Sequence, residues 1–263
     1  MSGLGKKMIP KTIHYCWFGR NPKPKLFLKC ENSWRKYCGE YKLVEWNEDI
    51  FDIKASPLYV QQAYKAGKWA FITDYVRLYA LFHQGGIYMD TDVEVTKSLD
   101  VFLKHKGFSG FEDEMSVPTG IMAAEAGHPL IREWLEEYDS RTFFLPDGMM
   151  NLETNVVTIT NSMKGHGLRL DNSLQTVADF TFYPKDYFCP KSYHDGKIYK
   201  TRNTHSIHHF AGSWKSEDER KAHEKWIRHE RVERITRPGK DAIKSLIGEK
   251  TYGKIKERVK GHQ

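Results

Sequence analysis

The chain has 263 residues, of which 40% are hydrophobic, 29% charged and 13% aromatic. This composition is typical of a soluble globular protein with a large hydrophobic core. No apolar run approaches the roughly 20 residues of a membrane span, and the start lacks the apolar stretch of a secretion signal. The four cysteines have no C-x-x-C spacing, which argues against a zinc ribbon or a disulfide scaffold and favours a reducing cytoplasm.

The positive charge is concentrated at the C-terminal end. Of the formal net charge of +7, residues 215–263 contribute +6, from 15 basic and 9 acidic side chains. Nucleic-acid-binding proteins usually carry a basic surface across the folded domain, whereas here the body is nearly neutral and only the tail is basic. No zinc-finger, RNP or KH-type signature is present. We therefore expect one domain over residues 1–214, a basic helical C-terminal extension over residues 215–263, and no nucleic-acid partner.

Strands and helices alternate along the first half of the chain. The pattern predicts strands over residues 11–18, 41–46 and 87–89, and helices over residues 26–37 and 68–84, the latter ending at Gly85-Gly86. A further helix is expected to begin at Ser56-Pro57, with Ser56 as its cap. This βαβααβ order predicts an α/β fold with a mostly parallel sheet and a ligand crevice at the carboxyl ends of the strands.

The second half is less regular. His128-Pro129 is typical of a helix start, and residues 180–188 and 206–210 resemble strand ends. Residues 151–172 fit neither pattern, and the sequence from residue 217 onward indicates charged helices.

Asp90 and Asp92 form the most informative short motif. A D-x-D is expected about once by chance in a chain of this size, and such a motif can simply be an acidic turn exposed to solvent. Here the motif follows Gly-Gly and an apolar strand, so both carboxylates can converge where the strand ends. Two carboxylates, diphosphate oxygens and waters make the hard oxygen site that suits Mg²⁺ or Mn²⁺.

Other polar and aromatic side chains are expected at the same crevice. Asp74 and Arg77 share a helix face, where they form either an ordinary ion pair or hydrogen bonds to sugar hydroxyls or ribose. Trp17 ends the first strand, where it either packs in the core or stacks on a nucleobase. The segment 208–214 (HHFAGSW) offers a histidine that would complete the coordination of a metal, although surface histidines would give the same pattern.

Three sequence blocks together resemble glycosyltransferase family 32. Residues 9–19 (IPKTIHYCWFG) are similar to its "IPKxIHxxWxG" opening, residues 73–77 and 85–92 (TDYVR, GGIYMDTD) to its "SDxxR…GGxYxDxD" block, and residues 208–214 to its closing "HHxxGSW". The blocks follow the family order, and Thr73 replaces the commoner Ser. The family contains fungal initiating mannosyltransferases and bacterial capsule and lipopolysaccharide transferases, and the glucosylating clostridial toxins have a related core.

The resemblance implies a GT-A-like, Rossmann-type mixed sheet flanked by helices. It implies a metal-dependent retaining hexosyltransferase that takes a hexose or N-acetylhexosamine from a nucleotide sugar, with UDP favoured over GDP. The acceptor would be a glycan or lipid-linked glycan in capsule, lipopolysaccharide or other surface polysaccharide synthesis. Because the membrane anchor of fungal members is absent, a cytoplasmic bacterial enzyme is expected, with the basic extension docking on the anionic inner face of the plasma membrane.

The same resemblance implies roles for individual residues. For the donor, Trp17 stacks on the base, Tyr88 lies beside the nucleoside, Asp74 and Arg77 hold sugar and phosphate, and Ser213 and Trp214 close over the diphosphate. For Mn²⁺ or Mg²⁺, Asp90 reaches ribose and metal, Asp92 binds the metal, and His209 is the third protein ligand, with the adjacent His208 as the alternative. Asp74, Arg77, Asp90 and Asp92 form the expected catalytic set.

Two other functions remain open from the residues alone. Phosphatases of the haloacid dehalogenase type carry D-x-D-x-T/V after an apolar strand, but here the fifth position is Glu94 and the motif lies far from the start of the chain. A non-catalytic module that binds nucleotide sugars or glycans would need the same crevice without turnover.

Overall fold

The computed structural model describes residues 8–193 and 195–212, together with residues 218, 221–222, 225–228 and 236. The chain divides into two compact units, Met1–Ser192 with Ile198–Trp214, and Tyr193–Lys197 with Lys215–Gln263. In the second unit the described positions from 218 onward are helical, and the rings of Tyr193 and Trp226 lie 6.3 Å apart. Most of the predicted C-terminal extension falls outside the described residues.

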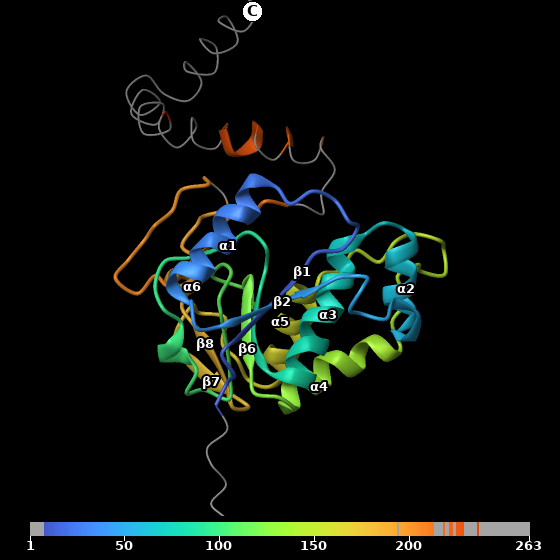
Figure 1. The fold of residues 1–263 in the computed structure, drawn as a ribbon, viewed down its shortest axis with the longest axis horizontal. Coiled ribbons are helices and arrows are strands. Elements are labelled where there is room, and N and C mark those ends of the chain that lie inside the picture. The colour runs from blue at the N-terminus through green and yellow to red at the C-terminus, as the bar shows by residue number, and fades with distance from the viewer. Residues whose placement is uncertain are drawn as a thin grey trace, which may run out of the picture. The chain divides into compact units, whose positions relative to one another are not determined.

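The first unit is built on a seven-stranded mixed sheet with the order β2-β1-β3-β6-β5-β8-β7 (Figure 1). The strands are β1 (Thr12–Cys16), β2 (Lys42–Trp46), β3 (Gly86–Met89), β5 (Gly107–Gly110), β6 (Ile121–Ala124), β7 (Gln175–Val177) and β8 (Phe180–Tyr183). β1 runs parallel to β2 and β3, and β5 runs parallel to β8. The other three pairings are antiparallel, so the expected parallel arrangement holds for β2, β1 and β3 and for the β5–β8 pair, but not for the sheet as a whole. A separate antiparallel pair joins β4 (Val93–Val95) to β9 (Ser206–His208).

The α-helices confirm most of the predicted ones. They are α1 (Lys25–Tyr37), α2 (Leu58–Lys65), α3 (Trp69–Gln84), α4 (Pro129–Glu136), α5 (Asn155–Gly165) and α6 (Lys185–Phe188), with 3₁₀ turns at Ile53–Ala55, Asp100–Phe102 and Glu137–Asp139. The imidazole of His128 caps α4 by accepting from the backbone N–H of Leu130. None of the described helices combines the length and the apolar character that crossing a membrane requires.

The predicted cap of α2 is wrong. Ser56 is the C-cap residue that directly follows the 3₁₀ turn Ile53–Ala55, and its hydroxyl donates to the carbonyl of Ile53 at 2.6 Å. Pro57 then takes the N-cap position without a side-chain hydrogen bond, and the helix begins at Leu58. The Ser56 hydroxyl therefore hydrogen-bonds to the preceding 3₁₀ turn and does not cap the first turn of α2.

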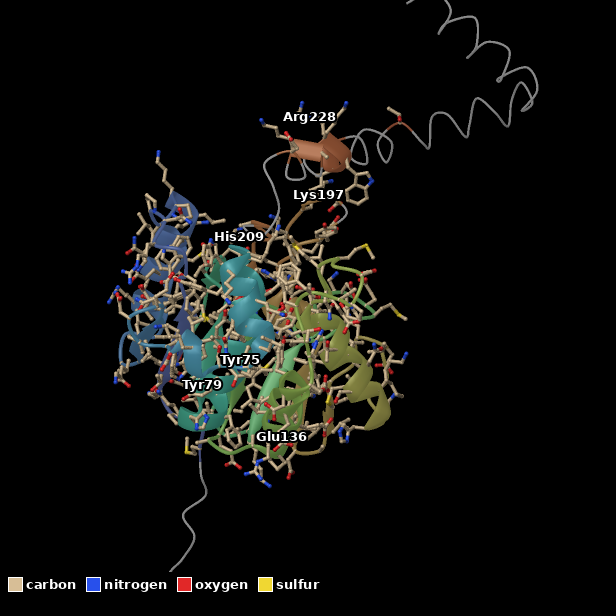
Figure 2. The ribbon with its side chains drawn as sticks, turned by 90° about the vertical axis from the view of Figure 1, so that its right-hand side faces the viewer. Tyr75, Tyr79, Glu136, Lys197, His209 and Arg228 are labelled. Carbon is tan, nitrogen blue, oxygen red and sulfur yellow. The ribbon has the colours of Figure 1, made fainter. Side chains whose placement is uncertain are left out.

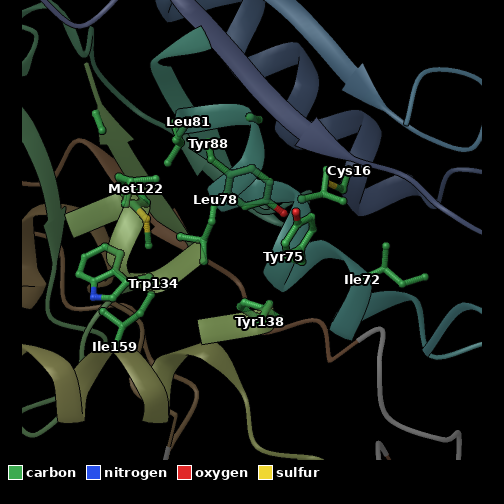
Figure 3. Close-up of a cluster of buried hydrophobic side chains, with 14 of the residues drawn as sticks. Cys16, Ile72, Tyr75, Leu78, Leu81, Tyr88, Met122, Trp134, Tyr138 and Ile159 are labelled. Carbon is green, nitrogen blue, oxygen red and sulfur yellow. The ribbon is translucent and has the colours of Figure 1, made fainter. Parts of the chain in front are cut away.

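The sheet separates two hydrophobic layers, because side chains alternate along each strand. Ile13 and Tyr15 of β1 pack with α1 and α6, whereas Cys16 and the neighbouring Tyr88 of β3 pack with α2 to α5. Figure 3 shows the second layer, where α3 contributes several of the buried side chains. Burying each large apolar side chain contributes about 1.5–3 kcal/mol, so these layers hold the strand ends in place.

A tight turn fixes the position of β3. Gly85 and Gly86 both have positive φ, and a Cβ on Gly86 would lie 2.8 Å from the carbonyl oxygen of Thr12. The Nε2–H of His14 donates to the carbonyl of Gly85 at 2.8 Å, while its Nδ1 accepts from the indole of Trp46. The histidine of the opening sequence block and the Gly-Gly of the second block thus form one structural unit that sets where Asp90 falls.

Candidate metal and donor site

Asp90 and Asp92 lie in a turn directly after β3. The backbone N–H of Asp90 donates to the carbonyl of Gly120 at 2.8 Å, and that of Val93 closes the turn onto the Asp90 carbonyl. The Asp92 carboxylate accepts from the N–H of Ala211 at 2.6 Å. Because β4 pairs with β9, the chain around residue 208 is brought alongside this turn.

Asp90, Asp92 and His208 form a cluster in which one potential ligand atom from each lies within 4.8 Å of the others. His208 Nε2 is 3.4 Å from Asp92 Oδ1, and the histidine is 9% exposed. Two carboxylates and one imidazole are a donor set that fits Mn²⁺ or Mg²⁺, with room left for substrate oxygens and waters as further ligands.

Of the two histidines considered for the third ligand, the alternative His208 lies at this cluster, whereas the predicted His209 lies beside Glu94; which of them binds a metal stays a prediction. His209 points away from the aspartates, and its Nε2 lies 2.8 Å from Glu94 Oε2, which also accepts from Lys29 at 2.6 Å. Adjacent residues of an extended segment face opposite sides, so only one of the two histidines can reach the cluster. In Figure 2 His209 lies at one end of the first unit and Glu136 at the other.

The charges in the cluster support one another. Burial opposes ionisation of Asp92, but His208 and the N–H of Ala211 lower the pKa of this carboxyl to about 2. Burial likewise opposes protonation of His208, yet Asp92 raises the pKa of the imidazole well above its usual value. The two groups therefore form an ion pair, and a metal held by Nε2 of His208 would take the place of the proton on that nitrogen.

Arg77 links α3 to the D-x-D turn. Its Nη2 lies 3.2 Å from Asp74 Oδ1 and 3.1 Å from Asp90 Oδ1, so the intrahelical ion pair exists and also extends to the motif. Asp74 in turn accepts from the backbone N–H of Asn155 at the start of α5. Burial raises the pKa of Asp74 to about 6, although Arg77 opposes this shift.

The hydroxyl of Tyr88 helps to hold the carboxylate of Asp90 in place. It is 2% exposed, its hydroxyl donates to Asp90 Oδ1 at 3.2 Å, and the guanidinium of Arg77 lies 4.6 Å from the centre of its ring. The ring of Tyr88 is buried beneath this carboxylate, and its expected place beside a nucleoside stays a prediction.

Trp17 lies at the same edge of the sheet as Asp90. The β1–β3 register pairs His14 with Tyr88, and Trp17 and Asp90 follow these two residues within three positions. The indole is half-buried against Phe27 and donates to the carbonyl of Asn21 at 2.7 Å. Stacking of Trp17 on a base stays a prediction. Ser213 and Trp214 lie outside the described residues.

Three further residues contact the predicted ones. A Cβ on Gly120 would lie 2.9 Å from Val93 Cγ2, 3.1 Å from Asp90 Oδ2 and 3.2 Å from His208 Cδ2, so any other residue here would require these side chains to shift. Glu112 Oε1 lies 3.3 Å from His208 Nδ1. Asn155 is 3% exposed, and its side-chain nitrogen has no hydrogen-bond partner among the described residues. The sequence offers only a weak indication of Gly120, which precedes an apolar strand. It offers none of Asn155, which lies in residues 151–172, where neither a helix nor a strand pattern was found.

The sequence comparisons agree with this site. Residues 24–109 match the family described as "Glycosyltransferase sugar-binding region containing DXD motif". Inositol phosphoceramide mannosyltransferases 3 and 2 of Schizosaccharomyces pombe are 26% and 25% identical to the chain over 126 and 186 residues, or 47% and 64% of it. A mannosyl phosphorylinositol ceramide synthase of Saccharomyces cerevisiae is 23% identical over 69% of the chain. The chain covers 35%, 50% and 49% of the lengths of these three relatives.

Solved structures give looser likenesses. The galactosyltransferase LgtC has a TM-score of 0.42 and 11% identity, covering 84% of this chain and 95% of its own. A glycosyltransferase involved in glycosylation of the major capsid of PBCV-1 has a TM-score of 0.43 and 12% identity, covering 81% and 97%. At these scores the likeness supports no conclusion about activity. From its sequence matches, the chain resembles the glycosyltransferases with a DXD motif over residues 24–109, and it is similar in sequence to the fungal mannosyltransferases.

Proposed function

We propose that the chain is a metal-dependent, retaining glycosyltransferase that moves a hexose or N-acetylhexosamine from a nucleotide sugar to a glycan or lipid-linked glycan. The observation that carries this proposal is the Asp90–Asp92–His208 cluster at the carboxyl end of β3, joined through Arg77 to Asp74. Surface polysaccharide synthesis at the cytoplasmic side of a membrane is the setting we propose for it.

Asp90, Asp92 and His208 would hold Mn²⁺ or Mg²⁺, which when bound supplies positive charge to the diphosphate that leaves. The protein keeps these ligands in place beforehand. Arg77 and Tyr88 bind the Asp90 carboxylate, and the N–H of Ala211 binds that of Asp92. Such preorganisation is commonly the largest contribution to catalysis.

Asp74, Arg77 and Asn155 are the residues we propose for the donor sugar. The backbone N–H of Asn155 donates to the Asp74 carboxylate, and the side-chain amide nitrogen of Asn155 is a buried donor that a sugar hydroxyl would satisfy. When the sugar–phosphate bond breaks, positive charge develops on the sugar carbon. In a retaining transfer the leaving phosphate can accept the proton of the acceptor on the same face, so we name no protein nucleophile or base.

Trp17, Ser213 and Trp214 are proposed for the base and the diphosphate. The resemblance favours UDP over GDP as the nucleotide. The printed names of the fungal relatives add mannose and a phosphoceramide-type lipid acceptor to the compounds worth testing.

The deciding experiment incubates the protein with a panel of UDP- and GDP-sugars and Mn²⁺ and measures nucleotide release by mass spectrometry. We expect slow hydrolysis of one donor, loss of turnover in EDTA, and a fall of at least about 100-fold in Asp92→Asn, which removes one charge from the cluster. NMR of a product formed on an acceptor sugar tests retention. Tight nucleotide binding without turnover would favour a binding module, and phosphate release from simple esters would favour a phosphatase.

A further inference from the structure

The imidazole of His208 has a carboxylate at each nitrogen. Its Nε2 faces Asp92 Oδ1 at 3.4 Å, and its Nδ1 faces Glu112 Oε1 at 3.3 Å. The Nδ1 atom is buried, and none of its contacts with the described residues, that with Glu112 included, has the geometry of a formed hydrogen bond. The His208 side chain is therefore positioned by two opposite contacts, of which only one belongs to the D-x-D motif.

We propose that Glu112 is a positioning residue for the metal site: it accepts the Nδ1–H of His208, so that Nε2 is directed to the metal beside Asp90 and Asp92. The inference rests on the proposed metal-dependent function. Histidine ligands usually donate their second N–H to a carboxylate or carbonyl, which fixes the ring orientation and makes the ligand nitrogen more basic.

The surrounding backbone holds Glu112 where this contact needs it. Phe111, buried after β5, donates its N–H to the carbonyl of Tyr183 at 2.9 Å, and the N–H of Glu112 donates to the carbonyl of Ser116 at 2.9 Å. The Glu112 side chain is 22% exposed, and one of its carboxylate oxygens reaches the histidine ring. Cys189 also contacts the ring, but a thiol is a much weaker acceptor than a carboxylate.

The first measurement is Mn²⁺ affinity, read from the electron paramagnetic resonance signal of the free ion without any donor. Glu112→Ala should weaken binding by about 10–100-fold, the range for lost partners of metal-bound histidines. Glu112→Gln should lose less, because its amide oxygen still accepts from Nδ1–H. Glu114→Gln is the matched control: Glu114 is in the same loop, 67% exposed and paired with Lys185, so removing its charge should leave affinity unchanged.

A spectroscopic readout separates positioning from general electrostatics. Electron–nuclear double resonance of bound Mn²⁺ should show a nitrogen coupling that disappears in His208→Ala and is altered or lost in Glu112→Ala, but not in Glu114→Gln. Equal losses of affinity in the Glu112 and Glu114 variants, or an unchanged coupling in Glu112→Ala, would overturn the inference. Glu112-dependent Mn²⁺ binding without nucleotide-sugar turnover would support it while refuting the proposed transferase function.

Discussion

Arg77 is the residue through which the helix α3 and the D-x-D turn depend on each other. Its guanidinium contacts Asp74, Asp90 and the ring of Tyr88, and it is 6% exposed. Two carboxylates this close would repel each other without the cation between them, and removing one partner of a buried ion pair typically costs about 3–5 kcal/mol. The fold therefore depends on the same contacts that place the Asp90 carboxylate at the cluster.

The two adjacent histidines give a prediction at the residue scale. His208→Ala removes the nitrogen that faces Asp92, so the Mn²⁺ concentration needed for half-maximal donor hydrolysis should rise at least about 10-fold. His209→Ala removes only the partner of Glu94, and it should change this concentration much less. A Mn²⁺ titration of both variants checks the ranking, and the reverse order would restore the original choice of His209.

Trp17 gives a second prediction. If its ring stacks on the nucleobase, Trp17→Ala should weaken nucleotide binding by about 1–3 kcal/mol, the scale of aromatic–base stacking. Isothermal titration with UDP and GDP measures the loss, and a thermal melt measures folding separately. Unchanged affinity per folded molecule, together with a lower melting temperature, would mean that the contact with Phe27 is the sole role of the indole.

At the scale of elements, the loop before β6 has to pass very close to the cluster. Gly120→Ala would place a Cβ 2.9 Å from Val93 and 3.1 Å from Asp90 Oδ2, so the loop, the carboxylate or His208 must move. We expect a fall in donor turnover of about 10-fold or more, because small misplacements of reacting groups are expensive. Gly165→Ala is the control, since a Cβ there meets nothing within 4 Å and alanine suits the end of α5. Equal turnover in the two variants would show that the close approach at Gly120 does not affect donor turnover.

The elements up to Asp90 could be predicted because their signals are local. Helix periodicity, the prolines before α1 and the Gly-Gly after α3 each act within a few residues, and they gave β1 to β3 with small errors at the ends. α5 could not be predicted in this way. Its sequence, NVVTITNSMKG, is rich in β-branched residues, and long-range contacts such as those of Thr160 with Val117 and Trp134 with Ser162 hold it as a helix.

The closeness of several predicted site residues was predictable from the sequence, and the orientation of the two histidines was not. Asp74, Arg77, Asp90 and Asp92 are brought together as the motif spacing predicted. Whether His208 or His209 joins them depends on the register of β9 against β4, where Val93 pairs with His208. A shift of one residue reverses every side chain of a strand, and no local signal fixes such a register between segments more than a hundred residues apart.

At the scale of the whole molecule the charge is divided unevenly, and this has a bearing on where the acceptor is met. Residues 1–214 are nearly neutral, whereas residues 215–263 carry +6. Helices with Lys and Arg that are merely solvated would give the same numbers. The alternative is that the basic residues hold the protein at an anionic surface, where a lipid-linked acceptor would be found.

Vesicle binding distinguishes these two alternatives. Each Lys or Arg near an anionic bilayer contributes about 1 kcal/mol, so the seven basic and three acidic residues from Pro238 onward suffice for reversible binding. We expect co-sedimentation with vesicles that contain phosphatidylglycerol, weaker binding as salt rises, and loss of binding when residues 238–263 are deleted. Asp92→Asn should bind the vesicles normally, and the deletion should retain donor hydrolysis, because neither change touches the other function. Equal binding to neutral phosphatidylcholine vesicles, or no binding to anionic ones, would mean that these charges are only solvated.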